Sequence, residues 1–462
     1  MGTERKAAPA WHPSLEGMHD TVATPPAQAG FWRHWKAFVG PAVLVSVGYM
    51  DPGNWGTDLQ AGAQYHFGLL WVVAVASLMA IFMQILSARL GVVTGKDLAQ
   101  CCRDWYPRWT RWPNWILSEI AIAACDLAEV LGSAVALNLL FHIPLLWAVI
   151  ITGFDVLILL AMQRYGVRTI EAVVTLLIFT MGLCYWLEIF VLPATHPSFA
   201  AMGKAIISPS FGQAGMMYVA IGIIGATVMP HNLYLHSALV QSRKIRRDGP
   251  SLRKAISFNT LDSTVALTLA FFLNAAILVL AAMVFYGKAG VMLPSGVYVH
   301  FTADTDWIRQ AYLTLEPLLG TIAASFLFAI ALLASGQSST ITGTMAGQVV
   351  MEGFMHWRIA PWLRRLITRL FALVPAVLII GLRGESSVTD LLTLSQVILA
   401  LQLPFAMFPL LHFTSFRKRM GRWRSPAWLQ IAAWSSALLI TAADIYALPT
   451  SLHIAWQVII GH

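Results

Sequence analysis

Long apolar runs follow one another along the whole chain, separated by short polar connections. A run of about 20 apolar residues is long enough to cross the hydrocarbon core of a bilayer as a helix. The pattern therefore predicts an all-α polytopic membrane protein with a polar N-terminal tail, residues 1–37. The eleven predicted spans are residues 38–63, 68–91, 113–141, 144–163, 169–192, 211–240, 258–286, 311–335, 366–382, 389–412 and 427–448. The longest predicted connections are 193–210, 287–310 and 336–365, and the tail after residue 448 is too short for another crossing.

The composition agrees with a chain whose main solvent is lipid. Of the 462 residues 58% are hydrophobic and 11% charged, whereas soluble chains carry about 25% charged residues. The tail has no charged-then-apolar layout of a signal peptide, so we expect no cleaved leader. The cysteines lie in or beside the spans without zinc-like spacing, and we interpret them as packing residues. They are Cys101, Cys102, Cys125 and Cys184.

The basic residues predict how the bundle is oriented. Most of the 30 Lys and Arg residues fall in the tail and in the connections that share its side of the membrane. Cytoplasmic loops carry an excess of Lys and Arg, so we expect the N-terminus in the cytoplasm and the C-terminus on the periplasmic or extracellular side. The net charge of +8 is then a topology signal, and it requires no nucleic-acid partner. The opposite side receives only Lys204, Lys288, Arg309 and Arg383.

The first span is interrupted by the stretch VGYMDPGNWG, residues 47–56. Pro52 and Gly53 are poor residues for a helix interior, and we expect them to unwind this span near the middle of the membrane. Asp51 in lipid costs about 2.5–3.5 kcal/mol if it is unpaired. A broken helix with a carboxylate, an amide and bare carbonyls suits a dehydrated cation. The alternative is a proline kink in which Asp51 pairs with a basic residue of another span.

The sixth span has a matching interruption, GATVMPHNLYLHS, residues 225–237. Spans one and six each begin a possible five-span repeat, and paired broken helices indicate a transporter site at the bilayer midplane. A break before Pro230 exposes the carbonyl of Ala226 and turns the thioether of Met229 toward Asp51. With Asn54 these groups form a mixed oxygen and sulfur set that favours transition metal ions over Mg²⁺ and Ca²⁺. The alternative for Met229 is ordinary core packing.

The two interrupted segments carry a family resemblance. DPGN and MPHN resemble the paired metal-site motifs of the natural resistance-associated macrophage protein (NRAMP) family of divalent metal transporters. The stretch GQSSTITGTMAGQVVMEGF, residues 336–354, resembles that family's transport signature, which we expect to be a loop between spans eight and nine. The resemblance covers nearly the whole chain after residue 37.

The resemblance implies a leucine-transporter-like fold with two inverted five-helix repeats and one extra span. The repeats would be residues 38–192 and 193–412, with the extra span in 413–462. It also implies proton-coupled uptake of Mn²⁺ or Fe²⁺, with Cd²⁺ and Co²⁺ often accepted, and no cofactor beyond the transported ions. The short loops and short tail suggest a bacterial inner membrane.

The resemblance extends to single residues around the site. Asp51, Asn54, the Ala226 carbonyl and Met229 match the family's metal ligands. Gln396 matches a tenth-span glutamine that approaches the ion, and Asn274 resembles a seventh-span asparagine near the site. Tyr49, just before Met50, is a candidate for closing the vestibule. A buried amide bonded to backbone explains Asn274 nearly as well, and packing explains Tyr49.

A proton route requires buried ionisable groups that lead away from the metal. Asp126 and Glu129 in CDLAEVLGSA are three residues apart and share a helix face. The resemblance supports them, together with Asp51, as part of the inward proton route, paired with an arginine of span nine. His231 belongs to the gate or the route, or else caps carbonyls freed by Pro230, and His236 is a weaker gate candidate. The arginine candidates are Arg364, Arg365 and Arg369.

Two other function classes compete with a metal transporter. An ion-coupled amino-acid or amine symporter uses the same fold, but its substrate carboxylate would not favour a fixed acid at Asp51. An intramembrane metalloprotease requires HExxH or a comparable set, which His231 and His236 do not supply. The sequence also has no GxxxxGK[ST] nucleotide motif. We therefore expect a transporter and no enzyme.

Overall fold

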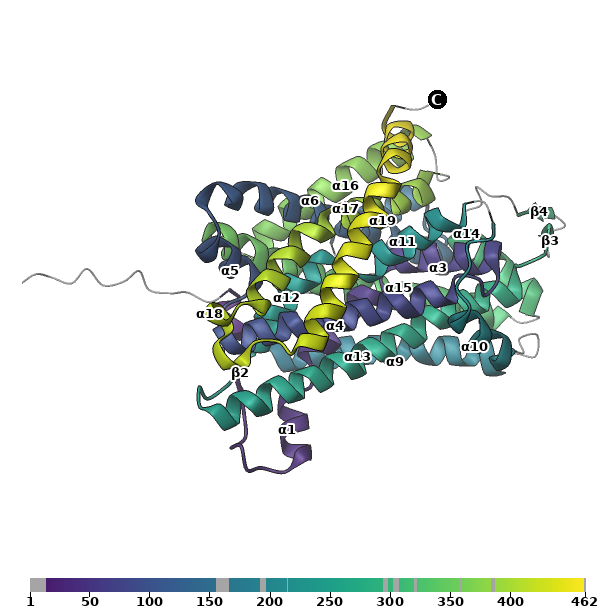
Figure 1. Ribbon diagram of the computed structural model, residues 1–462. Helices are drawn as coiled ribbons and strands as arrows, with labels where there is room; N and C mark the ends of the chain where they lie inside the picture. The colour runs from purple at the N-terminus through teal and green to yellow at the C-terminus, as the bar shows by residue number, and fades with distance from the viewer. Residues whose placement is uncertain are drawn as a thin grey trace, which may run out of the picture.

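The computed structural model describes residues 14–154, 166–191, 197–213, 215–293, 298–301, 307–319, 322–357, 359, 361–383 and 387–460. Its helices run side by side as one bundle (Figure 1), with α5, α18 and β2 at one end and α10, β3 and β4 at the other. The first half contains α1 (Phe31–Phe38), α2 (Pro41–Ser46), η2 (Val47–Met50), α3 (Pro52–Tyr65), α4 (Leu70–Thr94), α5 (Leu98–Trp105), α6 (Arg111–Phe141), α7 (Leu145–Thr152), α9 (Val167–Trp186) with η4 (Leu187–Val191), and α10 (Phe199–Ile207). The second half contains α11 (Met216–Thr227), α12 (Pro230–Leu239), η5 (Val240–Ser242), α13 (Gly249–Val284), α14 (Trp307–Leu319), α15 (Ile322–Met355), α16 (Pro361–Arg383), α17 (Ser387–Ser415), α18 (Arg417–Met420) and α19 (Ala427–Ile460).

Strands are few and short in the described part of the chain. β1 (Val22–Ala23) pairs in parallel with β2 (Arg243–Lys244), and β3 (Gly290–Met292) pairs antiparallel with β4 (Tyr298–His300). The predicted all-α class is confirmed, because the strands only join connections at the two ends of the bundle.

Most of the predicted spans correspond to observed helices, but the eighth, 311–335, is misplaced. Its residues are divided between α14 and α15, and the apolar span there is Ala323–Met355. Among the described residues, eight helices are long and apolar enough to cross a membrane, and Pro41–Met50 and Leu366–Gly381 are shorter apolar helices. The shortness of Pro41–Met50 results from the break in the first span. The fourth predicted span begins with α7, and its residues 155–163 lie outside the described part. The last helix, α19, continues to Ile460, and its apolar span, Ala427–Tyr446, agrees with the predicted span 427–448.

The prediction that residues 336–354 form a loop is also wrong. This stretch is helical and lies inside α15, which packs closely along α6. Its glycines and small hydroxyl residues permit that close approach. A side-chain carbon at Gly336 would overlap Ser133 Oγ of α6. Small residues at such interfaces let membrane helices pack backbone against backbone.

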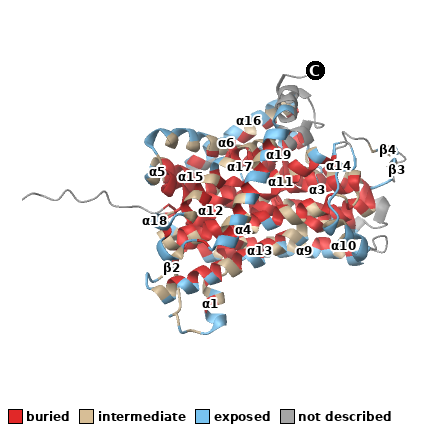
Figure 2. Ribbon diagram, in the orientation of Figure 1, coloured by how far each residue is buried: buried red, intermediate tan, exposed pale blue. Residues whose placement is uncertain are grey.

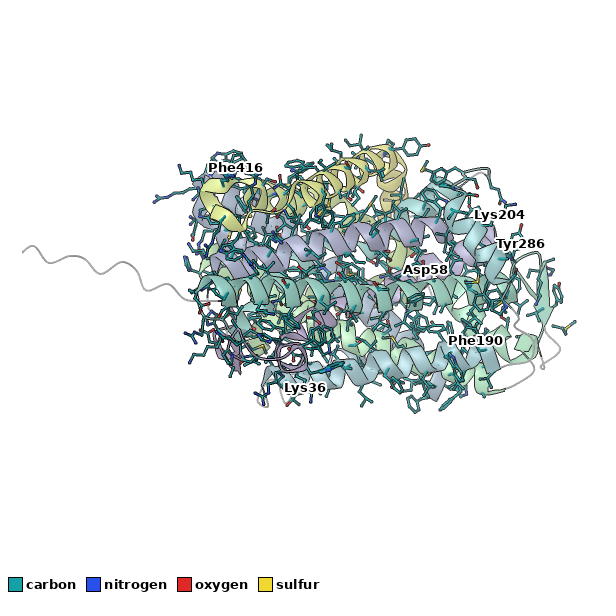
Figure 3. All side chains as sticks on the ribbon, turned by 60° about the horizontal axis from the view of Figure 1, so that its bottom comes forward. Lys36, Asp58, Phe190, Lys204, Tyr286 and Phe416 are labelled. Carbon is teal, nitrogen blue, oxygen red and sulfur yellow. The ribbon has the colours of Figure 1, made fainter. Side chains whose placement is uncertain are left out.

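The distribution of burial fits a bilayer. Buried residues fill the middle of the bundle in Figure 2. Phe272, Phe371 and Ile431 on three outer helices are 61%, 69% and 68% exposed, and soluble proteins seldom expose many such side chains together. The chain is an integral membrane protein. Figure 3 shows Lys36 and Lys204 at opposite ends of the bundle.

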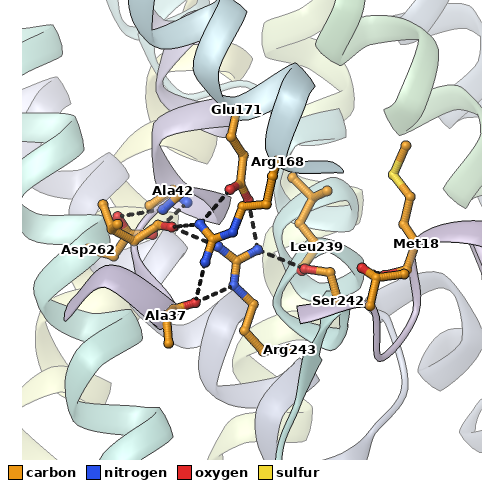
Figure 4. Close-up of polar contacts among 12 residues, drawn as sticks. Met18, Ala37, Ala42, Arg168, Glu171, Leu239, Ser242, Arg243 and Asp262 are labelled. Carbon is orange, nitrogen blue, oxygen red and sulfur yellow. Dashed lines mark hydrogen bonds and ion pairs between the residues drawn. The ribbon is translucent and has the colours of Figure 1, made fainter. Parts of the chain in front are cut away.

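A buried ionic cluster joins four elements at the end of the bundle that carries β2 (Figure 4). Arg243 Nη1 lies 2.7 Å from Glu171 Oε1 of α9, and Arg168 Nη1 lies 2.8 Å from Glu171 Oε2. Asp262 Oδ2 of α13 accepts a 2.9 Å hydrogen bond from the Ala42 amide, at the N-terminus of α2. The cluster therefore holds the first half of the broken first span against α9 and α13.

Replacing Glu171 with alanine is expected to destabilise the fold strongly. The Arg243 side chain has no exposed surface in the ion pair, and removing one partner of a buried pair costs about 3–5 kcal/mol. Thermal unfolding in detergent measures this loss. Lys96→Ala is the control, because its pair with Asp104 is partly exposed and such pairs contribute about 0–1 kcal/mol. Equal losses in the two variants would contradict the assigned role of the cluster.

Candidate metal-binding site

The first span is broken at Asp51, between η2 and α3. Asp51 has an extended backbone, with φ −70° and ψ 168°, and Pro52 begins the next helix. The prediction that Pro52 and Gly53 interrupt the first span is therefore confirmed, with the break directly before Pro52. Proline fits the first helical position because its missing N–H would have no partner there. Asp51 Oδ1 caps α3 by accepting a 2.9 Å hydrogen bond from the Asn54 amide.

The sixth span is broken where the sequence predicts it. Helix α11 ends at Thr227 and α12 begins at Pro230, and both Val228 and Met229 between them are non-helical. Asn54 Nδ2 donates a 3.1 Å hydrogen bond to the Ala226 carbonyl, so the two breaks face each other. A side-chain carbon at Gly48 would lie 3.2 Å from Met229 Sδ, which places the thioether beside the first break.

The Asn54 amide lies at the centre of this arrangement. Its Nδ2 donates to Asp51 Oδ1 at 2.7 Å, to the Ala226 carbonyl at 3.1 Å and to the Gly48 carbonyl at 3.4 Å. Asp51 is fully buried, and its Oδ2 has no hydrogen-bond partner among the described residues. Three oxygens that converge on one donor also suit a cation. The structure thus brings together the four residues predicted as ligands.

Gln396 and Asn274 also lie at the breaks. A side-chain carbon at Gly53 would overlap the Gln396 amide, so α17 contacts the first turn of α3 directly. Gln396 Oε1 has no hydrogen-bond partner in the described structure. Asn274 Nδ2 of α13 donates to the Tyr49 carbonyl at 2.7 Å and to Asn54 Oδ1 at 3.4 Å. Asn274 is thus a buried amide bonded to backbone, as the alternative interpretation has it, and it also contacts the proposed ligand Asn54.

Tyr49 and His236 are joined by a residue that the sequence analysis does not single out. Gln84 Nε2 of α4 donates a 2.7 Å hydrogen bond to the Tyr49 hydroxyl, and Gln84 Oε1 lies 2.9 Å from His236 Nδ1. All three side chains are buried. They connect η2, α4 and α12 on the N-terminal side of the first break, which is the side of the ionic cluster.

Asn232 is a second residue that the sequence analysis misses. It lies in the first turn of α12, is fully buried, and neither of its amide atoms has a hydrogen-bond partner among the described residues. A side-chain carbon at Gly48 would overlap Asn232 Nδ2. The MPHN motif contains Asn232, but nothing in its spacing separates this amide from an ordinary helix-cap residue.

The predicted proton-route residues meet beside the second break. Cys125 Sγ lies 3.7 Å from His231 Nε2 and donates a 3.4 Å hydrogen bond to Glu129 Oε1. Ser339 Oγ donates to the same Glu129 oxygen at 2.7 Å. Asp126 is buried on the same helix. Cys125 is therefore a connecting residue between His231 and Glu129, in addition to its predicted packing role.

The structure distinguishes among the span-nine arginines. Arg369 Nη1 lies 3.8 Å from Glu129 Oε2, whereas Arg364 Nη2 lies 2.8 Å from Glu119. The side chain of Arg365, the third candidate, lies outside the described residues. Of the two arginines whose side chains the structure describes, Arg369 is thus the one beside Glu129.

The donor set is a mixed one. Among the described residues no group of three or more His, Cys, Asp or Glu side chains gathers as a metal site. The site instead combines one carboxylate, amides, carbonyls and a thioether, a set in which the sulfur favours softer divalent ions.

A family model described as natural resistance-associated macrophage protein-like, Nramp, matches residues 42–450. The chain belongs to the Nramp family. Curated Nramp relatives include a protein from Nostoc sp. named divalent metal cation transporter MntH, 49% identical over 444 residues, covering 95% of this chain and 96% of the relative. A protein of the same name from Mesorhizobium japonicum is 48% identical over 434 residues, covering 93% and 91%.

Solved structures agree with the Nramp assignment. The crystal structure of a manganese transporter from Eremococcus coleocola has a TM-score of 0.85 and 38% sequence identity, covering 95% of this chain and 91% of that chain. Mhp1, a nucleobase-cation-symport-1 family transporter, has a TM-score of 0.58 at 13% identity and covers 95% of both chains. That second likeness concerns the fold alone. The predicted family and leucine-transporter-like fold are confirmed.

Proposed function

We propose that this Nramp protein imports divalent transition metal ions, Mn²⁺ or Fe²⁺ and also Cd²⁺ and Co²⁺, by proton-coupled alternating access. The observation that carries the proposal is the convergence of Asp51, Asn54, the Ala226 carbonyl and Met229 where two broken helices meet. The names of the relatives, divalent metal cation transporter and manganese transporter, support the same substrate class.

The Asn54 amide explains how the site accepts its substrate. Its Nδ2 donates to Asp51 Oδ1 and to the Ala226 carbonyl oxygen. A bound cation would attract the same two oxygens. Rotating the amide by half a turn directs Oδ1 toward the ion and Nδ2 toward Thr227 Oγ1, which lies 3.5 Å from the present position of Oδ1. Asn274 Nδ2 then loses its 3.4 Å hydrogen bond to Asn54 Oδ1 and keeps the 2.7 Å bond to the Tyr49 carbonyl. The ion then receives an amide oxygen in exchange for a water. Gln396 Oε1 and Asp51 Oδ2 supply further oxygens without losing an existing partner.

The ion enters from the outside and leaves toward the cytoplasm in this proposal. The N-terminus is cytoplasmic and the C-terminus periplasmic or extracellular, in a bacterial inner membrane, as the distribution of basic residues indicates. Reorientation of the repeats 38–192 and 193–412 around the fixed site alternates the access. The membrane potential supplies about 2.3 kcal/mol per charge for each 100 mV.

Purified protein in liposomes tests the function. We expect uptake of Mn²⁺ accompanied by acidification of the liposome interior. Ca²⁺ and Mg²⁺ should compete poorly with Mn²⁺ for this uptake. Glu129→Gln should retain Mn²⁺ binding but lose most of the acidification, because the carboxylate beside Arg369 and Cys125 no longer accepts a proton. Asp444→Asn, a buried carboxyl on the outer helix α19, is the matched control. Amino-acid uptake without metal dependence would refute the proposed function, and full acidification by Glu129→Gln would refute the route.

A further inference from the structure

The N-terminal tail contains an ordered segment that crosses one end of the bundle, and we name residues 14–24 the strap. Its first part is anchored on α15 and α5. The Leu15 amide donates a 2.9 Å hydrogen bond to Glu352 Oε2, and Gln100 Nε2 donates a 3.3 Å hydrogen bond to Ser14 Oγ. The Leu15 side chain is 5% exposed and belongs to the main hydrophobic core. This end of the strap is therefore part of the packed structure.

The second part of the strap is anchored on the segment that follows α12. The Asp20 amide donates a 3.0 Å hydrogen bond to the Gln241 carbonyl. Val22 and Ala23 form the short parallel ladder with Arg243 and Lys244. Thr24 Oγ1 adds a 2.6 Å hydrogen bond to the Lys244 carbonyl. The strap thus ties the exit of the second broken span to α15 and α5.

The strap also adjoins the buried ionic cluster. Val22 pairs with Arg243, whose guanidinium holds Glu171 of α9 and the Val39 carbonyl ahead of α2. Leu15 and Asp20 have φ angles of 55° and 54°, which non-glycine residues seldom adopt. The strap is therefore a bent segment held at both ends by contacts that cross between elements.

We propose that residues 14–24 form a cytoplasmic latch that holds the inward side of the transporter closed. Release of an ion toward the cytoplasm requires the half-helices α2 and α12 to move relative to α15 and α6. The strap bonds to the chain just after α12 at one end and to α15 at the other, so this movement must break one set of contacts. The latch proposal rests on the proposed function in one respect: the step that the latch restrains is the inward opening of the transporter.

A cysteine reporter measures the latch without any metal. Ser46 of α2 is buried at 2% exposure, and Ser46→Cys in a chain without its four native cysteines should react slowly with maleimide from the cytoplasmic side. Deleting residues 2–24 or introducing Leu15→Asp should accelerate labelling about tenfold through a shift of population. Deleting residues 2–10 alone is the matched control and should leave the rate unchanged. Equal labelling rates in all these variants would overturn the latch.

A reversible crosslink provides the complementary variant if the deletion does not fold. Ala23 and Lys244 are paired in the ladder, a distance suited to a disulfide. Together with a second cysteine pair at the other end of the strap, Ser14→Cys with Gln100→Cys, Ala23→Cys with Lys244→Cys should block uptake when oxidised and restore it when reduced. If the oxidised protein takes up Mn²⁺ as fast as the chemically reduced protein, the latch proposal is wrong. If neither the reduced form nor the intact protein takes up Mn²⁺, the proposed function is refuted. The latch is still tested in that case, because the maleimide labelling rate does not depend on transport.

Discussion

Replacing Asp51 with alanine is expected to abolish metal uptake. Asp51 provides the only carboxylate among the four proposed ligands, and it is fully buried with Oδ2 unpartnered in the described structure. Removing one partner of a buried charge pair costs about 2–5 kcal/mol. A loss of this size weakens Mn²⁺ binding by a factor between roughly 30 and several thousand. Uptake in liposomes and calorimetric titration with Mn²⁺ measure the effect.

The Asp51 variant requires two comparisons. Asp51→Asn retains the size and the α3 cap but removes the charge, so it should also fail to transport. Asp444→Ala removes a buried carboxyl from α19 and should transport at close to the rate of the intact protein. Robust uptake by Asp51→Ala with unchanged Mn²⁺ affinity would exclude the carboxylate from the site.

Replacing Met229 with alanine is expected to change selectivity more than the rate of Mn²⁺ transport. The oxygen ligands from Asp51, Asn54 and Ala226 remain, so Mn²⁺ is still carried. Ca²⁺ and Mg²⁺ are hard cations that gain nothing from a thioether, and they should become effective competitors and substrates once it is removed. Uptake of Mn²⁺ with increasing Ca²⁺ or Mg²⁺ measures this change.

The matched control for Met229→Ala is Met216→Ala. Met216 is a buried methionine at the start of α11, so it controls for the loss of a large apolar side chain. It should leave the ratio of Mn²⁺ to Ca²⁺ transport unaltered. An unchanged ratio in Met229→Ala would remove sulfur from the coordination of the ion.

The sequence predicts the site well because its residues conflict with their surroundings. A carboxylate and a proline inside apolar runs are costly in lipid unless the helix breaks around a ligand. Asp51 and Pro230 therefore indicate the breaks without any knowledge of packing. The second break lies where predicted, and the first lies at Asp51, directly before Pro52.

The features that the sequence does not reveal depend on contacts between helices. Gln84 and Asn232 are single amides whose importance comes from Tyr49, His236 and Gly48 across the bundle. The selection of Arg369 depends on the register of α16 against α6. Residues 336–354 fall between the predicted apolar runs but form a helix, because their small side chains allow a close approach to α6. The strap resembles an ordinary polar tail until Leu15 is placed in the core.

Anomalous diffraction from crystals grown with Mn²⁺ tests the central claim most directly. The two broken helices should enclose one dehydrated ion, so we expect a single strong peak between them. Oxygens of Asp51, Asn54 and Ala226 should lie within about 2.0–2.6 Å of the peak, with Met229 Sδ on the opposite side. A peak elsewhere in the bundle, or an ion that touches only water between the breaks, would contradict the account.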